Sequence, residues 1–462
     1  MGLLKPPFNF LASIRLAVLT ILSLAIITAI GTITEARYDS EVAVKLVYQS
    51  VYMYFILGTL AVTLIAVMVD RWPWKQHHAG FVLAHVGILL ILLGAWMTQK
   101  YGIDGTMTFA IGEEQRTVVI RDRELNVYSS LDGTSFQNMF HSEVDFLRHP
   151  PSEKTPYVVN LGSDRLVFTH YENFSFRESE IVATENEPDG PAIRFQLENP
   201  NVNLTQWLRR ESRRNEAEVD LGPAKVILAR SLPPPMNRNA VILIEQPGQD
   251  QFDYVIYNKD NSVRKKGKVK QSETVETGWM GMKFRLLRYL PHARENVSYR
   301  PSPTASPIST SALQFTFNGQ QYWLGLNSVL RLYQSDKMYV VSYGYRQLQL
   351  TFPLRLQEFH IGTYEGTARA ASYESVVDVP GRGRVTISMN EPLDFNGFTF
   401  YQSSFEKDER GEPVASVLSV NQDPGRWVKY LGCILMIAGC VVLFYFKRIK
   451  WLDGLKQSRS KT

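Results

Sequence analysis

Four apolar stretches constrain this chain more than any other feature of its sequence. They cover residues 16–33, 51–69, 79–97 and 427–446, and each is close to the ~20 apolar residues that cross a bilayer as a helix. Such a chain is expected to be an integral membrane protein. The mean hydropathy of the whole chain is only −0.15, so most of the remaining residues are expected to lie in water.

The first stretch has a basic start, with Lys5 and Arg15, which is also typical of a secretory signal peptide. Its apolar run is long for a signal peptide, and three further apolar stretches follow it. We therefore predict that it is retained as a membrane anchor.

The positions of lysine and arginine predict the orientation. Lys5 and Arg15 precede the first stretch, Arg71 and Lys75 lie between the second and the third, and residues 447–462 are rich in basic side chains. These flanks share one side if both termini are cytoplasmic. The loop between the first two stretches then lies outside, although it carries basic residues too. The cytoplasmic flanks account for most of the net charge of +5, so no nucleic-acid partner is expected.

The long segment between the third and fourth stretches has the pattern of a β-rich domain. It contains many short runs rich in β-branched and aromatic residues, such as RTVVIRDRELNVYS and MYVVSYGYRQLQLTF, separated by Gly, Pro, Asn or Asp. Only VNLTQWLRRESRRNEAEV competes as a helix. The Pro/Ser-rich stretch RPSPTASPISTSA suggests a sub-boundary near 300–312, with candidate sheets at about 98–299 and 313–425.

The predicted fold is thus four transmembrane helices with a large, mostly-β extracytoplasmic domain between helices three and four. The expected division is a three-helix membrane region at 1–97, the β-rich domain at 98–425, the fourth helix at 426–446 and a basic cytoplasmic tail at 447–462. Membrane lipid is the first partner that this division implies.

The cysteines exclude several kinds of chemistry. Cys433 and Cys440 are the only two, and both lie in the fourth apolar stretch. Seven helical residues separate them by roughly 10 Å along the axis, which is too far for a disulfide. The chain has no Cys-x-x-Cys pair, no haem attachment sequence and no cysteine-rich zinc site. We predict no catalytic residue.

His85 is the residue most in need of an explanation. It lies about six residues, or ~9 Å, inside the third apolar stretch, where an ionisable side chain usually faces a bundle interior and serves function. The alternative is a histidine that only hydrogen-bonds a neighbouring carbonyl. His77 and His78 are weaker candidates, because they lie at the start of the same stretch. The five other histidines lie in the β-rich segment at no metal-ligand spacing.

If His85 binds a metal, this chain offers few second ligands. No residue one helical turn away can ligate, and the other three apolar stretches contain no histidine. Cys440, Met436 and Met68 are the remaining candidates within the chain. A site with two histidines would need a second protein.

Two parts of the sequence resemble the ResB/CcsB family of system II cytochrome c biogenesis. LASIRLAVLTILSLAIITAIGTI resembles the first span of that family, and FVLAHVGILLILLGAW resembles its histidine-bearing span. FPLRLQEFHIGTYEGTARAASYESVVDV, ISMNEPLDFNGFTFYQSSF and VLSVNQDPGRWVKYLG follow the family's order before its last span. The most specific elements are Asn390-Glu391-Pro392-Leu393 and Tyr401-Gln402-Ser403. The resemblance covers roughly 1–110 and 340–446, and the middle matches only in position and β character.

The resemblance implies a specific role. ResB-type proteins act with a ResC/CcsA-type multi-span partner, and the pair carries haem across a bacterial cytoplasmic (inner) or equivalent energy-transducing membrane to apocytochrome c. A b-type haem is held transiently between one histidine from each protein, and His85 matches the ResB-side ligand of the haem iron. The tryptophan-rich motif that presents haem belongs to the partner. The chain would then be a non-catalytic subunit of a haem transfer complex.

Two other functions stay open at this point. The chain could be a membrane-anchored extracytoplasmic β scaffold without haem, in which His85 only packs. It could also be a self-contained b-type haem electron carrier that uses His85 with Cys440 or a methionine. For the segment 390–403 we expect a turn at 394–397 followed by a strand, and a role in fixing the β domain near the membrane through residues such as Tyr401.

Overall fold

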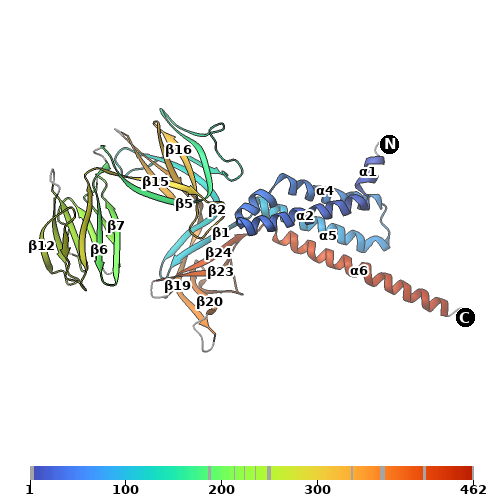
Figure 1. The fold of residues 1–462 in the computed structure, drawn as a ribbon. Coiled ribbons are helices and arrows are strands. Elements are labelled where there is room, and N and C mark those ends of the chain that lie inside the picture. The colour runs from blue at the N-terminus through green and yellow to red at the C-terminus, as the bar shows by residue number, and fades with distance from the viewer. Residues whose placement is uncertain are drawn as a thin grey trace. The chain divides into compact units, whose positions relative to one another are not determined.

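The computed structural model describes residues 5–185, 189–212, 214–222, 224–234, 236–246, 251–334, 337–364, 370–408 and 413–459. The chain divides into two compact units. The first comprises residues 1–175 and 301–462, and the second is Phe176–Arg300. Figure 1 shows the path of the chain through both.

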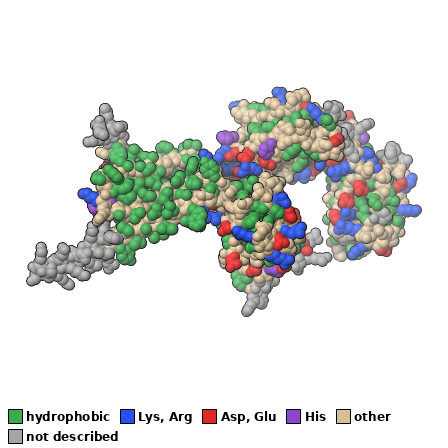
Figure 2. Space-filling view, turned by 180° about the vertical axis from the view of Figure 1, so that it is seen from behind, with side chains coloured by type: hydrophobic (Ala, Val, Ile, Leu, Met, Phe, Trp, Pro, Cys, Tyr) green, Lys and Arg blue, Asp and Glu red, His purple; other side chains and the backbone are tan. Residues whose placement is uncertain are grey.

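Among the described residues, four helices are long and apolar enough to cross a membrane, in agreement with the four predicted stretches. They are α2 (Ile14–Arg37), α4 (Val51–Asp70), α5 (Ala79–Tyr101) and α6 (Arg426–Arg459). The shorter helical elements are α1 (Lys5–Leu11), α3 (Ser40–Ala43), the π-helix η1 (Val44–Tyr48) and the 3-10 helix η2 (Gln76–His78). Hydrophobic side chains cover the outside of the helical part (Figure 2), as expected of helices that face lipid.

Helices α5 and α6 pack through a seam of glycines. Glycines recur at every seventh position of α5, at residues 80, 87 and 94. The same spacing separates Gly432 and Gly439 of α6 from Gly425, which lies directly before that helix. A Cβ added at Gly80 would lie 2.8 Å from the carbonyl oxygen of Gly439, and one at Gly432 would lie 2.7 Å from that of Gly87. The two backbones therefore approach too closely for any side chain at these positions, as is common where membrane helices associate.

The pairing of two strands explains why these helices are neighbours. Strand β1 (Ile103–Ala110) follows α5 directly, and strand β24 (Pro413–Gln422) precedes α6. The two strands pair antiparallel along the whole of β1, from Ile103↔Gln422 to Ala110↔Ala415. The end of α5 and the start of α6 therefore lie side by side. Residues more than 300 positions apart in sequence meet there.

The largest sheet has ten strands in the order β21-β20-β19-β2-β1-β24-β23-β22, with β18 also paired to β19 and β3 to β2. Its further strands are β2 (Glu114–Ser130), β3 (Gln137–Val144), β18 (Ser328–Tyr333), β19 (Met338–Thr363), β20 (Ala370–Val379), β21 (Gly383–Ser388), β22 (Leu393–Phe395) and β23 (Phe398–Lys407). One buried cluster takes side chains from strands along this order, from β21 to β22, and includes Met107, Phe109, Leu354 and Phe400.

A five-stranded sheet has the order β15-β5-β16-β17, with β4 paired to β5. Its strands are β4 (Tyr157–Leu161), β5 (Asp164–Ala183), β15 (Ala293–Pro301), β16 (Thr310–Phe317) and β17 (Gln320–Gly325). The first parts of β5 and β16 pack against residues of β2 and β19 in a second buried cluster that includes Leu125, Phe168, Phe315 and Tyr343. Strands from both sides of residues 300–312 thus share sheets.

The second unit contains two further sheets. One has the order β12-β11-β10-β9-β8 and the other β13-β14-β6-β7. Their strands are β6 (Ala192–Asn199), β7 (Val202–Arg209), β8 (Glu216–Asp220), β9 (Ala224–Ala229), β10 (Asn239–Glu245), β11 (Gln251–Tyr257), β12 (Val263–Lys270), β13 (Thr274–Glu276) and β14 (Lys283–Leu290). Residues 202–209 and 216–220, in the one segment with a helix-like pattern, are therefore strands.

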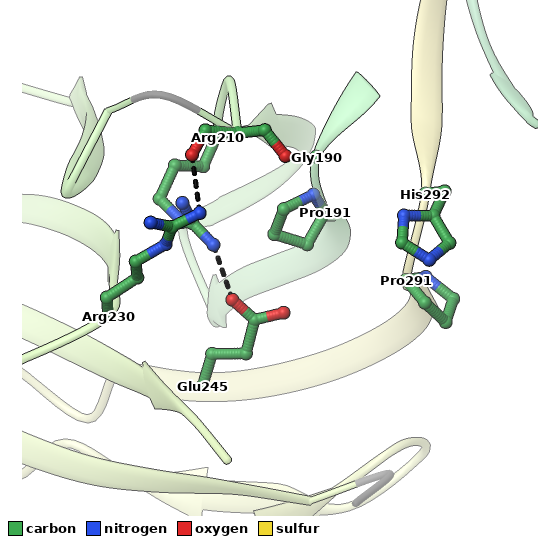
Figure 3. Close-up of a pocket in the computed structure, with 8 residues that line it drawn as sticks. Gly190, Pro191, Arg210, Arg230, Glu245, Pro291 and His292 are labelled. Carbon is green, nitrogen blue, oxygen red and sulfur yellow. Dashed lines mark hydrogen bonds and ion pairs between the residues drawn. The ribbon is translucent and has the colours of Figure 1, made fainter. Parts of the chain in front are cut away.

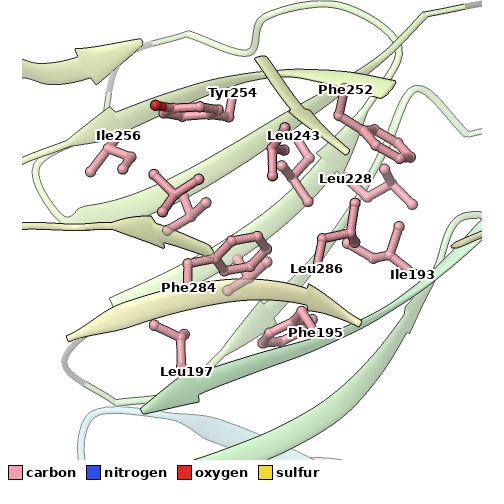
Figure 4. Close-up of a cluster of buried hydrophobic side chains, with 14 of the residues drawn as sticks. Ile193, Phe195, Leu197, Leu228, Leu243, Phe252, Tyr254, Ile256, Phe284 and Leu286 are labelled. Atoms are coloured by element: carbon pink, nitrogen blue, oxygen red, sulfur yellow. The ribbon is translucent and has the colours of Figure 1, made fainter. Parts of the chain in front are cut away.

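Side chains from both of these sheets form one core (Figure 4). The rings of Phe195 and Phe284 stack with their centroids 5.7 Å apart, and Leu228, Leu243 and Ile256 from the other sheet are fully buried with them. Each such side chain contributes about 1.5–3 kcal/mol when it is fully buried. This core gives the second unit a hydrophobic interior of its own.

Candidate functional site

His85 lies on α5 with one ring nitrogen already engaged. Its Nδ1 is 2.8 Å from the carbonyl oxygen of Phe81, one turn earlier in the helix. A carbonyl oxygen can only accept, so Nδ1 carries the proton of the neutral ring and Nε2 keeps its lone pair. In the part of the chain that the structure describes, Nε2 has no hydrogen-bond partner. A ring nitrogen with a free lone pair is the atom through which an imidazole binds a metal.

Aromatic and cationic groups surround the same turn of α5. The rings of Phe81 and His85 lie 3.9 Å apart between centroids, and the guanidinium of Arg71 lies 4.0 Å above the Phe81 ring. These contacts restrict the rotation of both rings. Phe81 therefore holds the imidazole of His85 in one orientation, through its backbone carbonyl and through its ring.

His85 does not point into the glycine seam. The seam positions 80, 84, 87 and 91 share one face of α5, and His85 lies roughly 130° round the helix from the centre of that face. The side chain is half-buried. It is therefore free to face another helix, or a second protein, without disturbing the contact with α6.

The candidates for a second ligand within the chain lie on α4 and α6. Met436 belongs to the seam, because its backbone nitrogen would lie 2.5 Å from a Cβ at Gly87. Cys440 is exposed on α6, and Met68 is buried in α4. Among the residues described, no group of three or more His, Cys, Asp or Glu side chains could hold a metal ion.

His77 and His78 form a separate pair at the start of α5. Their rings lie 4.0 Å apart between centroids, and the backbone N–H of Lys75 donates to Nδ1 of His78 over 3.3 Å. His77 is exposed and His78 is half-buried. Seven helical residues, or roughly 10 Å along the axis, separate His78 from His85, so the two cannot share one iron. The structure brings His77 and His78 together but not with His85.

A buried arginine joins the loop between α2 and α4 to the β strands, and the sequence analysis did not single it out. Nη2 of Arg123 donates to Oε2 of Glu41 over 2.7 Å, and Nη1 donates to the hydroxyls of Tyr171 and Tyr343 over 2.5 and 3.2 Å. Burial raises the pKa of Tyr343, which keeps its hydroxyl neutral. Lys45 adds ion pairs to Glu41 and Asp145.

A second polar cluster fixes the ends of α5 and α6. Thr98 donates to Oδ1 of Asp423 over 2.6 Å, and Nζ of Lys429 donates to Oδ2 over 2.7 Å. Burial acts to raise the pKa of Asp423, but the hydrogen bonds from Lys429 and Thr98 outweigh burial, and the pKa is lowered. The carboxylate also accepts the N–H of Gly425 over 3.0 Å, in the turn directly before α6.

The two motifs that carry the family resemblance lie in the ten-stranded sheet. Asn396 and Gly397 form the predicted turn between β22 and β23, with φ of +50° and +83°, as a two-residue hairpin of type I′ requires. Leu393 is buried in the core beside β1. In the second motif Gln402 is the buried residue, and its Oε1 accepts from the hydroxyl of Ser375 over 2.6 Å. Tyr401 is 37% exposed, and its expected role in fixing the β domain near the membrane stays a prediction.

Comparison with known proteins confirms the predicted resemblance. Residues 327–416 match the model of the ResB-like family, and they cover β18 to β23 and the start of β24. Protein NrfI of Wolinella succinogenes is 24% identical over 437 residues, which cover 94% of this chain and 34% of NrfI. The chain therefore spans about a third of the length of this curated relative, and the similarity extends well beyond the two parts recognised from sequence motifs.

Proposed function

Since this is a ResB-like chain, we propose that it is a membrane subunit of cytochrome c biogenesis that holds haem through His85. With a ResC/CcsA-type multi-span partner it transfers haem across the membrane for attachment to apocytochrome c. The observation that carries the proposal is the state of the His85 ring. Its Nδ1 proton is engaged by Phe81, which leaves the Nε2 lone pair for iron.

The residues present fit a haem that is shared with a partner. Neutral imidazole is a good iron ligand, and a bound haem would supply the cargo that the system delivers. The Phe81 carbonyl acts as the outer hydrogen-bond acceptor that orients a ligating histidine and raises its basicity. His85 faces away from α6, and in this proposal the ResC/CcsA-type partner would supply the second ligand to the haem iron.

The polar clusters at the ends of the helices support a mechanical role for the β strands. Arg123 holds the loop between α2 and α4, and Asp423 holds the ends of α5 and α6. We expect this pair of contacts to keep the helix that bears His85 in a fixed position relative to the ten-stranded sheet. In the proposed orientation both termini are cytoplasmic, and the β strands lie outside, where apocytochrome c would be met.

The proposed function is tested by the absorbance of the purified full-length chain. We expect no Soret band when the chain is produced alone, and a Soret band when it is produced and purified with a ResC/CcsA-type protein. A Soret band in the chain alone would favour the self-contained electron carrier. The absence of a band in both samples would contradict haem binding and favour the β scaffold.

The orientation needs its own test. Asp132→Cys should react with a membrane-impermeant thiol reagent added from outside, and Ser458→Cys should not, in variants whose two natural cysteines are replaced by serine. The reverse pattern would place the β strands in the cytoplasm and would exclude delivery to an extracytoplasmic apocytochrome.

A further inference from the structure

The second unit contains a cavity whose polar groups have no role in the proposed function. Its volume is about 380 Å³, within the range of small-molecule sites. Figure 3 shows Arg210, Arg230 and Glu245 on one side of the opening, and His292 with Pro291 on the other. All of the lining residues belong to residues 176–300.

The charges around this cavity do not cancel. Two arginines and one glutamate line it, which leaves one positive charge when His292 is neutral. Oε2 of Glu245 accepts from Nη2 of Arg210 over 2.5 Å, and Oε1 accepts from the hydroxyl of Tyr289 over 3.1 Å. Both oxygens of Glu245 are therefore occupied, and the charge of Arg230 is not neutralised by this carboxylate.

Two buried nitrogens at the cavity lack partners. Arg210 is only 2% exposed and its Nε is buried, yet within the described chain this N–H has no hydrogen-bond acceptor. Nδ1 of His292 is likewise buried and unpaired. The Nε–H of Arg210 is always a donor, whereas Nδ1 of His292 donates only in one tautomer. A buried donor without an acceptor costs about 1–3 kcal/mol, so such groups are normally satisfied by protein, water or ligand.

The surrounding backbone holds these groups in place. The N–H of Arg210 donates to the carbonyl of Pro191 over 2.9 Å, and the N–H of Ala293 donates to the carbonyl of Gly190 over 2.8 Å. Gly190 has a φ of +68°, and a Cβ there would lie 2.7 Å from the backbone nitrogen of Ser212. The cavity is thus built on fixed loops, with the prolines at 191 and 291 as apolar walls.

We propose that this cavity binds the carboxylate group of a small organic acid. A carboxylate supplies acceptors for the N–H groups of Arg210 and Arg230, and it neutralises the remaining positive charge. A cation would meet two arginines and only one, already occupied, carboxylate. A neutral polar ligand would leave the charge unbalanced, and the proline walls suit the apolar body of an organic acid. The inference stands apart from the haem role of His85.

The test uses the full-length chain in nanodiscs of uncharged lipid, with benzoate as the probe and benzamide as its uncharged analogue. Saturation-transfer NMR should detect benzoate binding at least about tenfold tighter than benzamide, because an ionised acceptor strengthens hydrogen bonds to arginine. Arg230→Gln should weaken benzoate binding by about tenfold or more. This residue is exposed, so the variant should fold as the parent does.

Arg238→Gln is the matched control. It removes one positive charge from an exposed ion pair with Asp220 in the same unit, outside the cavity, and should leave benzoate binding unchanged. His292→Phe should weaken benzoate severalfold, because it removes the second unpaired nitrogen. Equal binding of benzoate and benzamide, or an Arg230→Gln variant that binds benzoate like the parent, would overturn the proposal.

Competition distinguishes two sources of the carboxylate. Displacement of benzoate by protoporphyrin IX, but not by its dimethyl ester, would identify a porphyrin propionate. Displacement by hexanoate alone would identify a free organic acid. Tighter binding of inorganic phosphate than of benzoate would contradict a carboxylate site. None of these outcomes bears on His85, whose role is read from the Soret band.

Discussion

His85 in α5 and His292 in the second unit both have a ring nitrogen without a hydrogen-bond partner in the described chain, but their surroundings differ completely. The ring of His85 contacts a backbone carbonyl and the ring of Phe81 on an apolar helix. His292 lines a cavity with Arg210, Arg230 and Glu245. An imidazole on an apolar helix suits a metal ligand, whereas a site lined by two arginines suits an anion.

The role of an unpaired ring nitrogen thus depends on the charge around it. In α5 the neighbour of the His85 ring is the ring of Phe81, and the lone pair on Nε2 is what the imidazole offers to an incoming iron. In the second unit the positive charge is already present, so the missing partner is a negative one.

The largest effect is expected at the glycine seam. Gly87→Leu should lower the stability of the folded chain by about 3 kcal/mol, because a Cβ there would already lie 2.5 Å from the backbone nitrogen of Met436. Gly58→Leu on α4 is the control, since a Cβ at Gly58 has nothing within 4 Å. Thermal unfolding in detergent compares them. Equal midpoints would mean that α5 and α6 do not pack through the glycine seam. The direction in which His85 faces could then not be inferred from that seam.

Removal of the Arg210 guanidinium should be the next most severe change. Arg210→Met leaves the carboxylate of Glu245 with only the hydroxyl of Tyr289 and should cost about 2–3 kcal/mol. Arg238→Met should cost less than about 1 kcal/mol, because its ion pair is exposed. Denaturant unfolding measures both. Equal stability of the two variants would mean that the Arg210–Glu245 ion pair does not hold these two side chains in place at the cavity.

The motif before α6 gives a smaller contrast within one strand. Gln402→Ala removes a buried acceptor of the Ser375 hydroxyl and should lower stability by about 1–2 kcal/mol. Tyr401→Ala changes a partly exposed ring and should cost less than about 1 kcal/mol. The yield and melting temperature of the two variants decide between them. A larger loss for Tyr401→Ala would assign the larger packing role to the tyrosine.

The smallest effect concerns pH. The pKa of Asp423 is lowered in the folded chain, so its contribution is present above the ordinary carboxyl pKa of 3.8 and is lost as pH falls below it. The parent should therefore lose about 1 kcal/mol more stability than Asp423→Asn as pH falls below that value. Melting temperatures across this range provide the measurement. Parallel pH curves for the two proteins would show that Asp423 contributes nothing through its charge.

The membrane part could be predicted from the sequence to a large extent. Apolar runs of about 20 residues have few alternatives, and one histidine in such a run is conspicuous because it is costly to bury. The turn at Asn396 and Gly397 was also predictable, since this pair is favoured where both φ values are positive. These are local signals that need no knowledge of distant contacts.

The β strands and the cavity show where such prediction ends. Pairing of β1 with β24, and of β2 with β19, joins residues more than 200 positions apart, and nothing local in the sequence specifies those partners. Arg123, Arg210 and His292 also gave no signal, because polar residues are common in strands and loops that face water. Only their burial, seen in the structure, distinguishes them from the other polar residues of this region.

The proposal that His85 holds haem is tested most directly by the absorbance spectrum of His85→Gly, produced together with a ResC/CcsA-type partner. The account predicts that the variant inserts and folds like the parent, loses the Soret band, and recovers part of it when imidazole is added to fill the vacated space. His77→Gly and His78→Gly, at the start of the same helix, should keep most of the band. A His85→Gly variant that retains the parent's full spectrum would show that His85 only packs, and the account of this chain as a haem-holding subunit through His85 would fail.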